Sequence, residues 1–151
     1  MEYKHRFKVE APLAAVRQFH QRMESFKALT PPPIIVQLHR APENPGQGDE
    51  MEFTLWLGPL PVRWLAEFTQ VDQDGFTDLQ KHGPFKRWVH HHHFTSQPNG
   101  STVIEDRIEV EIGLGMLTPI AVGMWLGLPL LFLYRQWRTR RALASIVEQQ
   151  A

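Results

Sequence analysis

Four consecutive histidines, His90 to His93, are the residues of this chain best suited to chemistry. They stand in the segment RWVHHHHF, which runs from Arg87 to Phe94 in a chain of 151 residues. An imidazole titrates near neutral pH, so it can transfer a proton, bind a metal ion or orient a ligand. Which histidines can act together depends on the element that carries them.

The segment has the alternation of a β-strand, in which every second side chain lies on the same face. Trp88, His90, His92 and Phe94 share one face, and the two aromatic residues mark it as the side that faces the core. The other two histidines take the opposite face, where we expect them to be solvated. His90 and His92 are therefore predicted to point inward together.

The following strand, STVIEDRIEVEI, places Asp106 alone among apolar residues on its inner face. The connection QPNGS suits a three-residue hairpin loop with Gly100 in the left-handed conformation. With this loop His92 pairs with Asp106, and His90 pairs with Ile108. A two-residue loop would set the apolar face of one strand against the polar face of the other. We therefore expect an inward cluster of two histidines and one aspartate.

Three interpretations of this cluster remain open. It can be a buried polar network in which Asp106 satisfies His92. It can orient the polar end of a ligand in an apolar cavity. It can perform acid–base catalysis, with His92 as the general base beside Asp106. A metal ion would need a third ligand, which neither His39 nor Glu52 is placed to supply, so no metal or other cofactor is expected.

The surrounding elements predict an α+β fold in a single domain, residues 1–151. The strand pattern YKHRFKVE precedes two short helices, APLAAVRQFHQ and RMESFKAL, which the prolines after Thr30 terminate. A meander of about six strands follows. A long helix is expected from about residue 119, with a kink near Pro129 and an end near residue 148. This helix can cover the dry face of a curved antiparallel sheet and leave a cavity between them.

Four other residues can contribute to such a cavity. Phe53 and Trp64 lie on the apolar faces of the middle strands, where we expect them to line it. Asp78 and Gln80 share one row of the strand FTDLQK. That row faces either the cavity or a hairpin edge, where its polar groups would make local hydrogen bonds.

The composition limits the class of partner and compartment. Lys plus Arg and Asp plus Glu both number 16, so the formal net charge is zero and a general nucleic-acid binder is not expected. The absence of cysteine excludes disulfides, thiolate zinc sites and cysteine nucleophiles. The charged, alternating N-terminal segment does not have the pattern of a signal peptide, and we expect a cytoplasmic protein.

An uncharged segment from Ile112 to Tyr134 is long enough to span a bilayer, and RQWRTRR follows it. A span is disfavoured because the sheet would lose its cover, and because Pro119, Pro129 and several glycines weaken an isolated helix. The apolar helix could instead contact a membrane surface or form a homodimer. Four arginines beside it would then face anionic lipid: Arg135, Arg138, Arg140 and Arg141.

Four segments resemble the SRPBCC superfamily, the START-like proteins with a helix-grip fold. They are VEAPLAAV, ALTPPPIIVQL, GFTDLQKHGPFKRWVHHHHF and TVIEDRIEVEI, and the resemblance runs over essentially the whole chain. They look closest to the bacterial group labelled ligand-binding SRPBCC or polyketide cyclase/dehydrase-like, whose members also occur fused ahead of epimerase-like domains. The group's paired histidines fall on His90 and His92, its glutamine on Gln80 and its later aspartate on Asp106.

The resemblance implies a sheet of about six to seven strands wrapped on a long C-terminal helix, with two short helices after the first strand. It also implies a cavity for a hydrophobic small molecule, either lipid-like or aromatic and polyketide-like. The leading hypothesis is that the protein binds such a molecule; whether it also catalyses a reaction stays open, with binding alone favoured. The ligand's polar end would be oriented by Gln80, His90, His92 and Asp106. Its body would pack against the aromatic residues Trp88, Phe94, Trp64 and Phe53.

Two alternatives accompany this hypothesis. One is a cyclase or dehydratase-type enzyme that uses His92 and Asp106 as its acid–base pair. The other is a membrane-peripheral or interaction module. The segment GLGMLTPIAVGMWLGLPLLFLY favours the second alternative. The resemblance predicts a link into the terminal helix that carries scattered polar residues, and this segment is more apolar than that.

Overall fold

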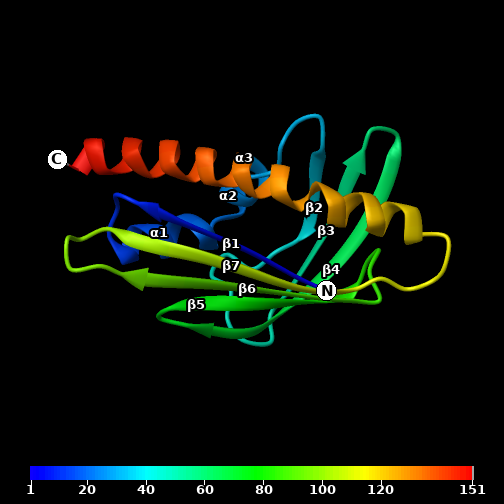
Figure 1. Cartoon of the computed structure of the whole chain (residues 1–151). Coiled ribbons are helices and arrows are strands. Elements are labelled where there is room, and N and C mark those ends of the chain that lie inside the picture. The colour runs from blue at the N-terminus through cyan, green and yellow to red at the C-terminus, as the bar shows by residue number, and fades with distance from the viewer. Residues whose placement is uncertain (151) are drawn as a thin grey trace.

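The computed structural model describes residues 1–150, and its elements follow the order expected from the sequence. They are β1 (Glu2–Val9), α1 (Leu13–Gln21), α2 (Met23–Ala28), β2 (Ile35–Arg40), β3 (Glu50–Leu57), β4 (Leu60–Asp72), β5 (Gly75–His82), β6 (Arg87–Ser96), β7 (Thr102–Glu111) and α3 (Thr118–Gln150). The long helix α3 lies along one face of the sheet (Figure 1).

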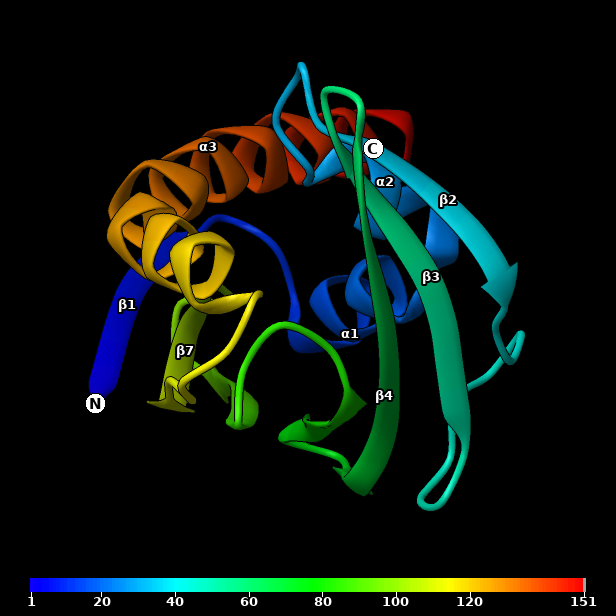
Figure 2. The ribbon, with the colours of Figure 1, turned by 90° about the vertical axis from the view of Figure 1, so that its right-hand side faces the viewer.

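The strands form one seven-stranded antiparallel sheet in the order β1-β7-β6-β5-β4-β3-β2. Consecutive strands from β2 to β7 are neighbours, and β1 closes the order beside β7. The sheet curves into a trough whose open side is crossed by α3, with α1 and α2 toward one end (Figure 2). This is the helix-grip architecture predicted from the sequence.

The hairpin between β6 and β7 has the predicted register. His90 pairs with Ile108 and His92 with Asp106. The loop has the expected three residues, because the Gln97 N–H donates to the Ser101 carbonyl over 2.8 Å. Gly100 takes a φ of 81°, the left-handed conformation that a side chain disfavours. Local turn chemistry therefore fixes which side chains meet in the site.

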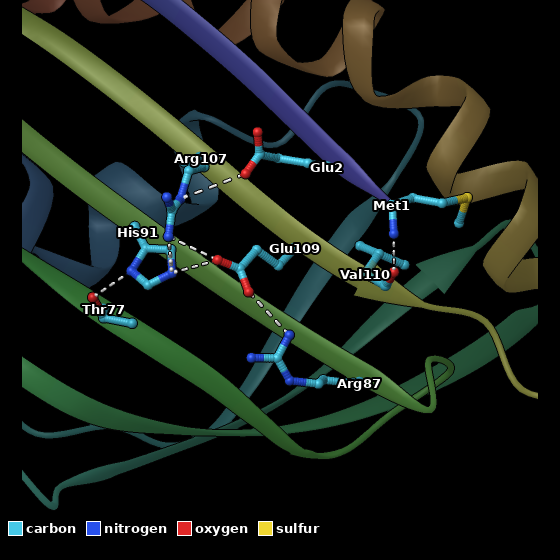
Figure 3. Close-up of polar contacts among 8 residues, drawn as sticks. All are labelled: Met1, Glu2, Thr77, Arg87, His91, Arg107, Glu109 and Val110. Carbon is cyan, nitrogen blue, oxygen red and sulfur yellow. Dashed lines mark hydrogen bonds and ion pairs between the residues drawn. The ribbon is translucent and has the colours of Figure 1, made fainter.

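The outer histidines lie on the solvent side of the sheet, as predicted. The ring of His91 contacts the Thr77 hydroxyl at 3.0 Å and the Glu109 carboxylate at 3.5 Å. Arg107 and Arg87 bind the same carboxylate from either side, at 2.7 and 3.0 Å (Figure 3). These contacts form a partly buried polar network on the solvent side of the sheet and leave the inner face to the other two histidines.

The helix α3 packs on the sheet through one narrow face. Its buried residues are Ala121, Leu128, Phe132, Thr139 and Leu143. The Phe132 ring lies 5.4 Å from the ring of Tyr3 and 5.8 Å from that of His90, so it contacts both β1 and β6. The helix continues through Pro129 and extends slightly beyond the predicted end.

The opposite face of α3 is apolar and exposed, and we call it the outer α3 face. It consists of Val122, Leu126, Leu130, Leu133 and Trp137, with Leu114, Met116 and Leu117 in the preceding loop. By length and composition α3 could cross a membrane, with a mean hydropathy of 1.3 over its most apolar window, and only 17% of that window is buried. A span would however expose the buried face that packs on the sheet.

Candidate functional site

A cavity of about 620 Å³ lies between the sheet, α2 and α3. This volume falls within the range of ordinary small-molecule sites. Its lining is largely apolar and includes Phe53, Trp64 and Trp88, as predicted. The sheet supplies these aromatic residues because alternation turns every second side chain of the curved strands toward α3.

At one end of the cavity, Asp106 on β7 contacts both inward histidines of β6. Its Oδ1 accepts a hydrogen bond from His90 Nε2 over 3.0 Å and lies 2.9 Å from His92 Nδ1. The second approach is poorly aligned, so His92 Nδ1 remains buried without a good hydrogen bond. The Asp106 carboxylate therefore contacts both imidazole rings, whereas the sequence analysis predicted a contact with His92 alone.

Asp78 on β5 completes the cluster from the other side. Its Oδ2 lies 3.4 Å from His92 Nε2 and 3.9 Å from His90 Nδ1. The strand register places it directly opposite His90. The sequence left open which row of β5 faces the cavity, and the structure assigns the row of Asp78 to it. The two histidines thus lie between two carboxylates.

The electrostatics of the cluster favour ionised carboxylates. Burial alone would raise the pKa of Asp106, but its contacts with His90 and His92 outweigh burial and hold the pKa far below its usual range. Burial also acts to lower the pKa of His92, and there Asp106 and Asp78 outweigh it and raise the pKa. For His90, burial and the neighbouring charge of His92 prevail and lower the pKa. Any proton that the pair binds is therefore held mainly by His92.

His20, at the end of α1, also lines the cavity. Its ring centre lies 6.4 Å from that of His92, and its Nδ1 donates to the Val16 carbonyl over 2.9 Å. Burial lowers its pKa to about 4. A neutral imidazole at neutral pH follows, with Nε2 left as an acceptor.

Arg135 brings a cation into the same cavity from α3. Its guanidinium lies 5.3 Å from the centre of the Phe132 ring, and its Nε is buried without a hydrogen-bond partner. Within residues 1–150, no carboxylate oxygen lies within 4.0 Å of its nitrogens. Burial lowers its pKa, while Asp106 and Asp78 oppose that effect from farther away. Arg135 therefore has hydrogen-bond donors that the protein leaves free.

Two of the predicted ligand-binding residues do not line the cavity. The Gln80 amide donates to the Phe85 carbonyl over 2.7 Å, and its oxygen accepts from the Phe85 N–H over 3.3 Å. This is the hairpin-edge role that the sequence also allowed. Phe94 is 1% exposed and packs with Phe7 and Ile104 in a separate part of the core.

The sequence analysis missed His20 and Arg135 as site residues, and for Asp78 it left open whether its row faces the cavity. For Arg135 a signal was present, because it lies three residues after Phe132 and four before Thr139. This spacing puts all three on one helical face. The sequence analysis grouped Arg135 with the arginines that follow it, and therefore did not place it on the same helical face as Phe132.

Comparisons with known proteins agree on the fold. A START superfamily protein from Mycobacterium smegmatis superposes with a TM-score of 0.67 at 10% identity, over 96% of this chain and 98% of its own. Ara h 8.0201 gives a TM-score of 0.59 at 12% identity, over 91% and 97%. No protein-family model and no curated protein matches the sequence.

A nucleoside-diphosphate sugar epimerase from Corynebacterium glutamicum contains a similar unit. It gives a TM-score of 0.71 at 22% identity, and the match covers 98% of this chain but 30% of the epimerase. At such identities these likenesses establish the fold alone. The chain has the START-like helix-grip fold that its sequence motifs predicted.

Proposed function

We propose that this protein binds a hydrophobic small molecule whose polar end accepts hydrogen bonds. The observation that carries the proposal is a largely apolar cavity of about 620 Å³ with the Arg135 guanidinium in its wall, whose buried Nε has no hydrogen-bond partner among residues 1–150. Apolar lining with a few convergent polar groups is the usual composition of a ligand site. Similarity to START-like and Ara h 8 structures is consistent with this use of the fold.

The free polar groups define the ligand's polar end. Asp78 and Asp106 are already engaged by the two histidines. Arg135 offers N–H donors, so the complementary ligand group is an oxygen that accepts, as in a carboxylate or a carbonyl. A buried cation costs free energy unless it is paired, and such an oxygen would supply the pair. A lipid-like acid or an aromatic ketide fits this description.

The cavity should take a fluorescent fatty acid such as cis-parinaric acid, and Arg135→Gln should weaken that binding by about 10- to 100-fold. The reason is the loss of charge-assisted hydrogen bonds to the carboxylate. Fluorescence titration measures the affinity, and the corresponding alcohol serves as the uncharged ligand. The variant should bind the alcohol nearly as well as the unmodified protein does.

Arg141→Gln provides the matched control for this titration. Arg141 is exposed and stacks at 5.2 Å over Trp137 on the outside of α3, so its removal should leave the affinity unchanged. Native mass spectrometry of the purified protein, followed by denaturing extraction, identifies any ligand that is retained. Equal effects of the two substitutions, or no affinity for either probe, would contradict the proposal.

The geometry supports binding better than acid–base catalysis. Both ring nitrogens of His92 face carboxylates, at 2.9 Å on the Asp106 side and 3.4 Å on the Asp78 side. His90 is placed similarly, at 3.0 and 3.9 Å. A general base needs a nitrogen within reach of the substrate proton. A cyclase or dehydratase would therefore require these rings to reorient.

A second proposed role concerns the outer α3 face, which we propose docks on an anionic lipid surface. Leu126 and Leu130 are 72% and 76% exposed, and in the preceding loop Leu114 is fully exposed. Leu130 also lines the cavity, so the exposed apolar surface continues to the ligand site. At the other end Arg138 and Arg141 lie over Trp137, which joins positive charge to an aromatic residue suited to a membrane interface.

Leu126→Glu combined with Leu133→Glu should reduce binding to phosphatidylserine-containing vesicles by at least about tenfold. Two carboxylates would then oppose both the apolar contact and the anionic surface. Vesicle cosedimentation at low salt measures the effect, and neither residue lines the cavity. The affinity for the fluorescent probe should therefore stay the same.

Leu60→Glu is the control for added charge, because Leu60 is 43% exposed at the first residue of β4. It should leave vesicle binding intact. The protein could instead fail to bind vesicles and form dimers in analytical ultracentrifugation. If the double substitution converts these dimers to monomers, the outer α3 face contacts a second copy. That result would reject the membrane proposal.

A further inference from the structure

Three potential metal ligands converge at the polar end of the cavity. They are one carboxylate oxygen of Asp78, a ring nitrogen of His90 and a ring nitrogen of His92, all within 4.8 Å of one another. The oxygen lies 3.4 Å from His92 Nε2 and 3.9 Å from His90 Nδ1. Ligand atoms around a tetrahedral zinc ion with ordinary bond lengths lie roughly 3.4 Å apart. The set therefore needs only small adjustments to enclose an ion.

Asp106 holds the two rings in the orientation that such a site requires. It contacts His90 Nε2 at 3.0 Å and His92 Nδ1 at 2.9 Å, in each case the nitrogen on the far side from Asp78. When both imidazoles are neutral and carry their protons on the nitrogens that face Asp106, the two nitrogens that face Asp78 present lone pairs. A carboxylate behind a metal-binding histidine is a common outer partner in protein metal sites.

Neighbouring strands fix the backbone positions of all four residues. Asp78 on β5 pairs with His90 on β6, and His92 on β6 pairs with Asp106 on β7. The His92 ring also stacks on Phe76, with 4.1 Å between ring centres. Sites built on strands and supported by packing hold their geometry better than sites on loops. The positions of the four side chains are therefore fixed before any ion binds, which a cluster of flexible surface side chains would not provide.

We propose that Asp78, His90 and His92 bind one divalent transition-metal ion, with Asp106 as the outer carboxylate. Two imidazoles and one carboxylate suit zinc, and also cobalt and nickel. Two carboxylates oppose the charge of the ion and of the nearby Arg135. The sequence predicted no metal because no third ligand was assigned, and Asp78 supplies it.

The three protein ligands leave a fourth position, and the site lies in the wall of the cavity. In that position the ion would bind an oxygen of the apolar ligand or a water molecule. This part of the inference rests on the proposed function. Metal binding itself does not, because the protein supplies three ligands before any small molecule enters.

Isothermal titration of EDTA-treated protein with Zn²⁺ tests the inference. One ion should bind per chain, Asp78→Asn should weaken binding by at least about 100-fold, and Asp106→Asn by about 10- to 100-fold. Co²⁺ in place of Zn²⁺ should give the visible absorption of a four-coordinate ion in the unmodified protein. Circular dichroism shows whether each variant remains folded.

The run of four histidines supplies its own control. His91 and His93 are the outward members of the run, the first half-buried and the second exposed, and an outward pair could collect metal without any built site. The double substitution His91→Asn with His93→Asn should retain the stoichiometric zinc site and its cobalt spectrum. Loss of binding in that variant, retention in Asp78→Asn, or no stoichiometric binding to the unmodified protein would each overturn the inference.

These outcomes are distinct from failure of the proposed function, because fatty-acid binding is measured separately in EDTA. Protein that binds zinc but no fatty acid or alcohol would keep the metal site and lose the ligand proposal. Protein that binds the fatty acid but no zinc would keep the ligand proposal and lose the metal site.

Discussion

Replacing Asp106 with asparagine is expected to lower the free energy of unfolding by about 3 kcal/mol at neutral pH in metal-free protein. Asp106 is 6% exposed and lies against both inward histidines. An asparagine of similar shape fills the space but removes the charge that stabilises a protonated His92. Urea denaturation in EDTA measures the loss.

The size of this loss should depend on pH. The raised pKa of His92 means that its contribution to stability is fully present below its unfolded pKa of about 6.5 and is lost as pH rises through the folded value. The depressed pKa of Asp106 gives a contribution that is present above about pH 4 and lost only as pH falls through its folded value. Because Asp106→Asn weakens the His92 contribution, the deficit should be larger near about pH 6 than near about pH 9.

Glu105→Gln is the matched control, since it makes the same chemical change one residue earlier on the same strand. Its side chain is 45% exposed and its nearest cation, Arg6, is 3.9 Å away. Surface pairs of this kind contribute little, so the change should stay within about 0.5 kcal/mol. A deficit for Asp106→Asn that is equally small, or that grows toward alkaline pH, would contradict the assignment of charge within the cluster.

The inward pairing of the site could be predicted because it depends on local rules. Alternation decides the face of each histidine, and the QPNGS loop decides which residue of β7 each one meets. Both rules act within a few residues, and the structure has the predicted register. The order of the elements and the covering helix follow from apolar periodicity in the same way.

The remaining site residues depend on contacts between segments that the sequence does not place. Asp78 and Gln80 occupy the same row of β5, yet the following loop turns back and occupies the Gln80 amide with the Phe85 backbone. A Cβ at Gly83 would overlap the Gln80 side chain, so glycine at this position leaves room for the Gln80 amide where it meets the Phe85 backbone. Arg135 enters the cavity only because of the rotation of α3 about its axis, which packing against the sheet determines.

The second large effect is expected from Phe132→Ala, which should destabilise the fold by about 3 to 5 kcal/mol. Phe132 is 1% exposed, and its ring lies within 5.8 Å of the rings of Tyr3, His5 and His90. Removal leaves a void between α3 and the sheet that rigid strands cannot close. It also removes the ring beneath the Arg135 guanidinium, so fatty-acid affinity should fall together with stability.

The neighbouring residue makes this prediction specific to the face of the helix. Leu133 is 55% exposed, and Leu133→Ala should change the free energy of unfolding by less than about 0.5 kcal/mol. Because Leu133 belongs to the outer α3 face, the same substitution should still weaken vesicle binding. Urea denaturation and vesicle cosedimentation of the two variants therefore separate the faces: Phe132 packs against the sheet, and Leu133 lies on the outer α3 face, for which we propose membrane docking. Similar losses of stability at both positions would mean that α3 is rotated from the orientation described above, and the placement of Arg135 in the cavity would fail with it.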